Sequence, residues 1–323
     1  MTTFDEKLRR STGPDSGGLF GVVTAVADRQ GRILQSSAGG RVKWTQDSHP
    51  PNLDTTYWAY SFTKLLTTIA ALQCVERGQI GLDDPVGPIL PELDEPRIIH
   101  SSDSKAGHDK SFQVVPAKGH ITLRHLLTHT SGIGYDAMNP ILTKWRESRG
   151  EGIMAMCGDV VKAYSMPLLF EPGESWSYGG GLDWAGQLVE RLSGCDRLGI
   201  YMEKNIFSKL KMPNTTFCVA DNPDIDAKLM DMSARTPAGD LVPSPEMYPR
   251  NAETDSGGMG IVTSVGDFMK VLVDLISEQP QLLRPETRDR MFEPQFATKS
   301  KHSTAMMAMP VSYLLFLSQV LKF

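Results

Sequence analysis

At Ser61 the sequence changes from strand-like to helical periodicity, and this change limits the folds open to the chain. Before it, residues 19–26 and 33–36 are short apolar runs around an Asp-Arg-Gln-Gly turn, a pattern typical of a β-hairpin. After it, apolar side chains recur every three or four residues up to Val75, and Gly78 follows as a stop signal. The pattern therefore predicts a hairpin and then a buried helix over residues 61–76.

The remaining pattern predicts two domains. Residues 81–91 are typical of a loop, and the charged stretch 101–118 is expected to be a mobile insertion without regular structure. Further helices are expected over residues 123–127, 152–163, 181–192 and 265–276. A helical middle bracketed by a segment that begins with strands predicts an α/β (α+β) fold. Its sheet domain would comprise residues 1–80 and 255–323, with a mainly helical domain, residues 81–254, inserted into it.

Composition excludes several classes of protein. The chain has 323 residues, 40% of them hydrophobic, which suffices for a large buried core. Its formal net charge is −5 without a basic cluster, so a nucleic-acid partner is not expected. Four cysteines without a Cys-x-x-Cys pair and seven scattered histidines lead us to expect reduced, mostly buried thiols, no metal and no cofactor. The polar N-terminus lacks the apolar core of a signal peptide, so a cytoplasmic protein is expected.

A Ser-x-x-Lys pair, in which a lysine activates a serine hydroxyl, is the first candidate for chemistry. The chain contains Ser61/Lys64, Ser102/Lys105 and Ser208/Lys211. About one chance match is expected at this length, so context must separate them. The second and third pairs lie in charged segments, whereas Ser61 and Lys64 share one face of an apolar helix, where burial disfavours the ammonium form. The helix N-terminus also suits an oxyanion. A helix cap with a snorkelling lysine remains an alternative at this point.

Tyr178 is the second candidate. It lies in the segment Trp-Ser-Tyr-Gly-Gly-Gly-Leu-Asp-Trp-Ala-Gly, residues 176–186. Three glycines after a tyrosine place its phenol in a loop where another backbone can approach closely. An ordinary aromatic residue at a helix entry is the simpler explanation of this motif taken alone.

Three motifs together resemble the serine β-lactamase-like family. They are SFTK at residues 61–64, HLLTHTSG at residues 125–132 and EPGESWSYGGGLDWAG at residues 171–186. The family includes class C β-lactamases, penicillin-binding carboxypeptidases and related esterases. The third motif looks most like the fungal polyketide acyltransferases, the branch that attaches the methylbutyryl side chain in lovastatin biosynthesis. The resemblance covers about residues 18–294.

The resemblance implies a β-lactamase/transpeptidase-like fold, an antiparallel sheet flanked by helices with an inserted helical domain. It also implies that Ser61 takes the acyl group, that Lys64 activates this serine and that Tyr178 shuttles the proton. His129 and Ser131 are expected to shape the turn beneath the site, and Tyr135 to line the acyl pocket and bind substrate.

The chain departs from the family pattern in two places. Gly180 replaces the usual asparagine, which looks like a trait of the acyltransferase branch. After about Gln295 we find no Lys-Thr-Gly or His-x-Gly strand, which in the family walls the site and supplies the second oxyanion donor. The apolar tail, residues 304–323, is interrupted by Pro310 and is short for a membrane span of about 20 residues, so we favour a truncated reading frame over a membrane anchor. An incomplete sheet would leave an open edge, and we expect this chain to be poorly stable and weakly active or inactive.

The leading functional hypothesis is an acyltransferase or esterase of polyketide secondary metabolism. A thioester or ester would acylate Ser61, and a hydroxyl of a small molecule would accept the acyl group. A synthase carrier domain is one source of the thioester donor, and a membrane partner is not expected. One alternative is a truncated, non-catalytic remnant of the family. Another is a β-lactamase-like hydrolase, which the missing signal peptide and the missing Lys-Thr-Gly strand disfavour.

Overall fold

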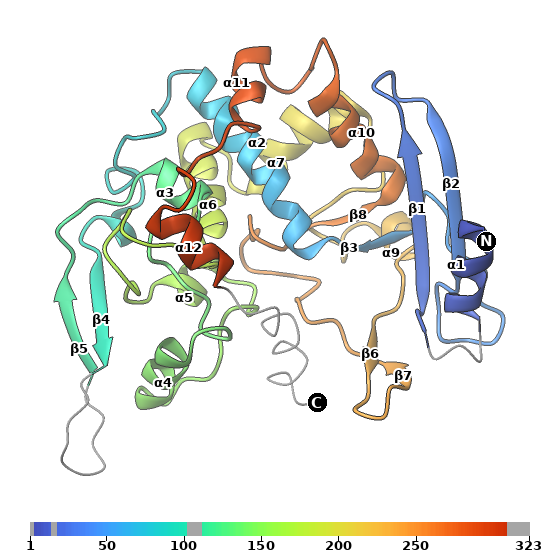
Figure 1. The fold of residues 1–323 in the computed structure, drawn as a ribbon, viewed down its shortest axis with the longest axis horizontal. Helices are drawn as coiled ribbons and strands as arrows, with labels where there is room; N and C mark the ends of the chain where they lie inside the picture. Colours follow the sequence, from blue (N-terminus) through green and yellow to red (C-terminus); the bar gives the residue numbers. More distant parts are fainter. Residues whose placement is uncertain (1–2, 14–17, 102–111, 309–323) are drawn as a thin grey trace. The chain divides into compact units, whose positions relative to one another are not determined.

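The computed structural model describes residues 3–13, 18–101 and 112–308 (Figure 1). Contacts between Cα atoms group the chain into two compact units. The first comprises residues 1–60, 202–251 and 260–288, and the second residues 61–201, 252–259 and 289–323. Such grouping does not test which segment is inserted into which, so the predicted domain division stays a prediction.

The first unit is built around an antiparallel hairpin. Strand β1 (Gly21–Ala27) pairs with β2 (Ile33–Gly40) in a register that places Gly21 opposite Gly40, which confirms the predicted hairpin. Helix α1 (Phe4–Thr12) packs on β2, and helix α10 (Val265–Ile276) packs on β1 (Figure 1). The predicted bounds of α10 are confirmed. Phe268, Val271 and Leu275 form its buried stripe because positions three and four apart share a helix face.

The other elements of this unit are short. They are β3 (Thr56–Trp58), which pairs with β8 (Val262–Ser264), the hairpin of β6 (Ser233–Arg235) and β7 (Leu241–Pro243), a π-helical turn (Glu203–Phe207), α8 (Ser208–Leu210) and α9 (Pro223–Asp226). Helix α11 (Pro285–Arg290) begins in this unit. In the described part of the chain, each of the four sheets has two strands.

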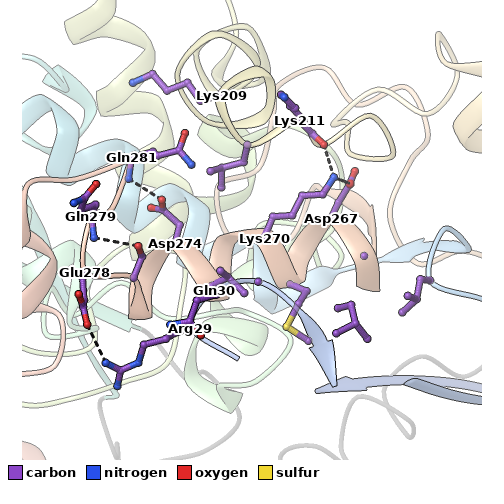
Figure 2. Close-up of a pocket in the computed structure, with 18 of the residues that line it drawn as sticks. Arg29, Gln30, Lys209, Lys211, Asp267, Lys270, Asp274, Glu278, Gln279 and Gln281 are labelled. Atoms are coloured by element: carbon purple, nitrogen blue, oxygen red, sulfur yellow. Dashed lines mark hydrogen bonds and ion pairs between the residues drawn. The ribbon is translucent and has the colours of Figure 1, made fainter. Parts of the chain in front are cut away.

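A cavity of about 1000 Å³ lies in the first unit between the β1–β2 turn, α8 and α10 (Figure 2). Its lining carries four basic side chains, Arg29, Lys209, Lys211 and Lys270, and four acidic ones, Asp54, Asp267, Asp274 and Glu278. Ion pairs join Arg29 to Glu278 at 3.3 Å and Lys270 to Asp267 at 2.8 Å. Because the charges balance, the lining has no excess charge with which to hold an ionic ligand.

The second unit is mainly helical. Its long helices, α2 (Thr63–Glu76) and α6 (Gly181–Ser193), lie side by side, and α3 (Leu123–Leu127) packs on α6 (Figure 1). The remaining elements are β4 (Arg97–Ser101), β5 (Phe112–Pro116), α4 (Pro140–Ser148), α5 (Val160–Tyr164), α7 (Leu198–Met202), α12 (Lys301–Met307) and short 3₁₀ turns at Tyr60–Phe62 and Pro91–Leu93. As the sequence predicts, α2 is buried on most of its surface.

Three sequence-based expectations are wrong in part. The helix expected over residues 152–163 exists only as α5, because Gly158 adopts φ 83° and the Asp159 side chain caps a new helix by accepting from the Lys162 amide. The stretch 101–118 is not irregular at its ends, since Phe112–Pro116 pairs with β4; residues 102–111 lie outside the described residues. All four cysteines are free, but only Cys74 is buried.

The apolar tail falls mostly outside the described residues, which end at 308. Of the helices in the described part, none is both long enough and apolar enough to span a bilayer.

Candidate active site

Ser61 lies in the 3₁₀ turn that leads into α2, and it is exposed. The preceding residue, Tyr60, adopts φ 43°, a left-handed conformation that is uncommon for a bulky residue. Such strain persists only where surrounding structure imposes it, and it is concentrated at functional sites. Here it directs the chain from the end of β3 into the turn that presents the Ser61 hydroxyl.

Ser61, Lys64 and Tyr178 meet in the second unit. The Ser61 Oγ lies 2.6 Å from the Tyr178 hydroxyl, and Lys64 Nζ donates to Ser61 Oγ at 3.3 Å. Lys64 Nζ also donates to the Gly258 carbonyl at 2.9 Å and lies 4.7 Å from the centre of the Tyr178 ring. The serine and lysine come together because they are one helical turn apart, whereas Tyr178 is 117 residues from Ser61 and arrives through the packing of α6 on α2.

Among the described residues, the pair Ser208 and Lys211 does not form such a site. Ser208 Oγ donates to Glu203 at 2.6 Å, and Lys211 ends α8 in a left-handed conformation, with φ 55°. Its carbonyl accepts a hydrogen bond from Lys270, so this segment is a helix end with solvated charges. Ser102 and Lys105 lie outside the described residues.

Aromatic and imidazole rings hold the Tyr178 ring. The ring of His129 lies 4.7 Å from it and that of Trp176 6.5 Å from it, between centroids. Burial, reinforced by the charge of Lys64, lowers the pKa of His129 to about 3, so this imidazole is neutral near pH 7. His129 Nδ1 accepts from the Gly179 amide at 3.4 Å, and Ser131 Oγ accepts from the Ile133 amide at 3.3 Å. These contacts agree with the expectation that His129 and Ser131 shape the turn beneath the site.

Tyr135 is buried beside the same groups. Its ring centre lies 5.7 Å from both Lys64 Nζ and the Tyr178 ring centre. Its hydroxyl donates to Asp183 Oδ2 at 3.1 Å, and burial together with this carboxylate raises its pKa well above the ordinary value. The hydroxyl is therefore engaged inside the protein. A role for Tyr135 in the acyl pocket stays a prediction.

Asp183, which the sequence reasoning missed, lies beneath the site. This residue of α6 is fully buried, and its carboxylate accepts hydrogen bonds from Ser256, from the Gly258 amide at 3.1 Å and from Tyr135. Burial raises the pKa of Asp183, while the charge of Lys64 and these hydrogen bonds oppose the rise. The signal in the sequence was an acidic residue inside the otherwise apolar segment Leu-Asp-Trp-Ala of a buried helix.

Within the described residues, no group of three His, Cys, Asp or Glu side chains is arranged to hold a metal ion. The hydroxyls and the amine of the site offer a serine nucleophile with a phenol and a lysine in hydrogen-bonding distance.

Comparison with known proteins identifies the family. The sequence matches the Beta-lactamase family over residues 5–316. It is also 36% identical over 320 residues to an acyltransferase of Penicillium decumbens, covering 93% of this chain and 75% of that protein. The chain belongs to the beta-lactamase family. The match begins earlier and ends later than the span of residues 18–294 that the motifs indicated.

Two further relatives are an esterase and an enzyme of known structure. The chain is 36% identical over 284 residues to the lovastatin esterase of Penicillium rubens, covering 86% of this chain and 70% of the esterase. The solved structure of unliganded simvastatin synthase from Aspergillus terreus matches with a TM-score of 0.79 and 34% identity, over 90% of this chain and 72% of that chain. The chain thus spans between 70% and 75% of the length of these relatives.

These findings confirm three predictions. The chain has the β-lactamase/transpeptidase-like fold, it groups with fungal acyltransferases of the lovastatin and monacolin type, and its relatives are enzymes that transfer or hydrolyse acyl groups.

Proposed function

We propose that this protein transfers an acyl group from a thioester or ester to Ser61, and from Ser61 to a hydroxyl group of a small molecule. The observation that carries the proposal is the meeting of three side chains, since Ser61 Oγ lies within hydrogen-bonding distance of both the Tyr178 hydroxyl and Lys64 Nζ. A nucleophile is weak until a neighbouring base takes its proton, and these two groups are placed to do so.

In the first half-reaction Ser61 Oγ attacks the carbonyl carbon of the donor. The Ser61 proton passes to the Tyr178 and Lys64 pair, and a new C–O bond forms as the carbonyl becomes an oxyanion. When the oxyanion collapses, the C–S bond of a thioester or the C–O bond of an ester breaks. The leaving thiolate or alkoxide takes the proton through Tyr178, whose hydroxyl is the nearer partner of Ser61, at 2.6 Å.

In the second half-reaction the acceptor hydroxyl attacks the acyl–Ser61 ester. Tyr178 and Lys64 receive its proton and return it to Ser61 Oγ as the ester bond breaks, so the enzyme is regenerated. A water molecule in place of the alcohol gives hydrolysis by the same steps. The balance between transfer and hydrolysis then depends on how well the acylated site excludes water.

The relatives favour a small-molecule acceptor from polyketide secondary metabolism. One is named a monacolin J acid methylbutanoyltransferase and another a lovastatin esterase, so the family branch both adds and removes acyl groups on such molecules. We extend this substrate class to the present chain. A donor thioester carried on a synthase domain and a location in the cytoplasm are further parts of the proposal.

The test is the intact mass of the protein after mixing with a short acyl thioester. We expect a gain of one acyl group in the parent and none in Ser61→Ala. The matched control is Ser208→Ala, which removes the serine of another Ser-x-x-Lys pair and should be acylated like the parent. Folded parent protein that gains no mass, or a Ser61→Ala variant that gains it, would refute the proposal and favour a non-catalytic remnant.

Trapping the acyl–enzyme with different acceptors then separates the two reactions. Loss of the acyl group to an added alcohol, with formation of the new ester, supports transfer. Loss to water at the same rate with and without alcohol makes the protein an esterase. Hydrolysis of a β-lactam through acyl–Ser61, with no adduct from thioesters or esters, would favour the β-lactamase-like hydrolase.

A further inference from the structure

The buried carboxylate of Asp183 is the feature of this site that the proposed chemistry does not use. It lies at the third position of α6, where the helix dipole favours a negative charge. Its side chain is 0% exposed. A carboxylate this deep normally either holds a proton or is compensated by a cation and by hydrogen bonds.

Three donors surround the carboxylate and satisfy both oxygens. Asp183 Oδ1 accepts from the Ser256 hydroxyl and from the Gly258 amide at 3.1 Å, and Oδ2 accepts from the Tyr135 hydroxyl at 3.1 Å. Two of the donors belong to a single turn, residues 256–258, and they fasten that turn to α6. The third is an aromatic residue whose ring lies beside Lys64.

The same turn is fastened to α2 on its other side. Thr67 Oγ1 donates to the Gly257 carbonyl at 2.7 Å, and Lys64 Nζ donates to the Gly258 carbonyl at 2.9 Å. Thr67 and Lys64 are one helical turn apart, so the turn lies along one face of α2. Gly258 thus connects the two helices, because its amide contacts Asp183 and its carbonyl contacts Lys64.

The carboxylate of Asp183 packs closely against Gly258. A Cβ on Gly258 would lie 2.4 Å from Asp183 Oδ2 and 2.8 Å from its Cγ. The carboxylate therefore determines where the Gly258 carbonyl lies, and this carbonyl takes one of the hydrogen bonds that Lys64 Nζ donates. Lys64 Nζ also donates a hydrogen bond to Ser61 Oγ, which is 3.3 Å away.

We propose that Asp183 is a positioning residue for acyl transfer, whose carboxylate orients Lys64 toward Ser61 through the Ser256–Gly258 turn and through its negative charge. This inference rests on the proposed function of Ser61. Asp183 touches neither the reacting serine nor the acyl group, so it acts through Lys64 and affects the rate of acylation more than the binding of the donor.

A merely structural carboxylate would act differently. It would stabilise the fold without changing the pH dependence of acylation. The groups that face Lys64 are Asp183, Gly258, Ser61 and the rings of Tyr135, Tyr178 and His129. Of these, Asp183 is the carboxylate, so replacing it with asparagine changes the charge that faces Lys64 and with it the pH dependence of acylation.

The experiment compares Asp183→Asn with a matched control, Asp136→Asn. Both positions are fully buried carboxylates that accept backbone amide hydrogen bonds, but Asp136 pairs with Arg146 at 3.2 Å and contacts none of the three candidate side chains. The acylation rate of Ser61 is measured from pH 5 to 9 by intact mass, with the donor concentration varied and the folded fraction determined by circular dichroism.

For Asp183→Asn we expect the maximal acylation rate to fall by about 10- to 100-fold, with little change in the donor concentration at half-maximal rate, and a changed pH profile. Asp136→Asn should lose stability and keep the parent's rate per folded molecule and its pH profile. Should Asp183→Asn not fold, Ser256→Ala and Tyr135→Phe each remove one donor to the carboxylate, and both should lower the rate.

An Asp183→Asn rate within about twofold of the parent, with an unchanged pH profile, would overturn the positioning role. Where Asp183→Asn does not fold, unchanged acylation rates in both Ser256→Ala and Tyr135→Phe would overturn the positioning role equally. A parent protein that forms no acyl–Ser61 would refute the proposed function, and this inference with it. An acylated parent with an unaffected Asp183→Asn would refute the inference alone.

Discussion

Gly179 offers a quantitative test of how tightly the Tyr178 loop is held. A Cβ at this position would lie 2.0 Å from the Ile133 carbonyl oxygen and 2.7 Å from the Gly134 Cα. Ordinary contact begins near 3.4 Å, so Gly179→Ala must separate the two segments by about 1.4 Å, which is 3.4 minus 2.0. Both atoms are backbone, so rotation of a side chain does not relieve the overlap.

The expected destabilisation follows from this overlap. Inserting a methyl group into a well-packed site costs about 1–3 kcal/mol, and a clash with backbone belongs at the upper end of that range. The same displacement moves Tyr178, whose hydroxyl lies 2.6 Å from Ser61 Oγ. A shift of about 1 Å in a reacting group lowers the rate by roughly 100-fold, so acylation should fall by at least an order of magnitude.

The assay is urea unfolding followed by circular dichroism, together with acylation of Ser61 by intact mass. Gly152→Ala is the matched control, because a Cβ added to this exposed glycine would meet no atom within 4 Å and the residue does not adopt a positive φ. We expect it to change the free energy of unfolding by less than about 1 kcal/mol. A Gly179→Ala protein as stable and as quickly acylated as Gly152→Ala would refute the account of this loop.

Two further predictions concern stability. Arg146 is 5% exposed and pairs with the buried Asp136 at 3.2 Å, so Arg146→Ala should destabilise by about 3–5 kcal/mol in urea unfolding. Arg149 is exposed and pairs with Glu151 at 2.9 Å, so Arg149→Ala should lower the free energy of unfolding by less than about 1 kcal/mol. Equal losses in the two variants would contradict the argument from burial. Burial raises the pKa of Glu190 to about 7. Between pH 4.5 and 7 the folded protein therefore holds a proton that the unfolded chain has released, so the free energy of unfolding falls as pH rises. Glu190→Gln should abolish about 3 kcal/mol of this decline between pH 4.5 and 8, and a parallel pH dependence of the parent and the variant would contradict it.

The amino-acid sequence determined the local elements on which the site is built. Helices α2, α3, α6 and α10 follow from apolar residues recurring at helical spacing, because hydrogen bonding in a helix is local. The spacing of Ser61 and Lys64 placed them on one face for the same reason. The β1–β2 hairpin was readable because a short turn joins strands that are adjacent in sequence. Where the local signals conflicted, as at Gly158 and in β5, the boundaries were wrong.

Only the tertiary structure decided which candidates meet. Context in the sequence favoured Ser61 and Lys64 over the other two Ser-x-x-Lys pairs, but the packing brings Tyr178 to them from 117 residues away and the Gly258 carbonyl from 194 residues away. Asp183 shows the same limit. Its acidic side chain was visible in an apolar helix, but its partners in the Ser256–Gly258 turn lie more than 70 residues further along the chain. Periodicity reports which face of an element is buried, whereas the partners on that face depend on the packing of elements distant in sequence.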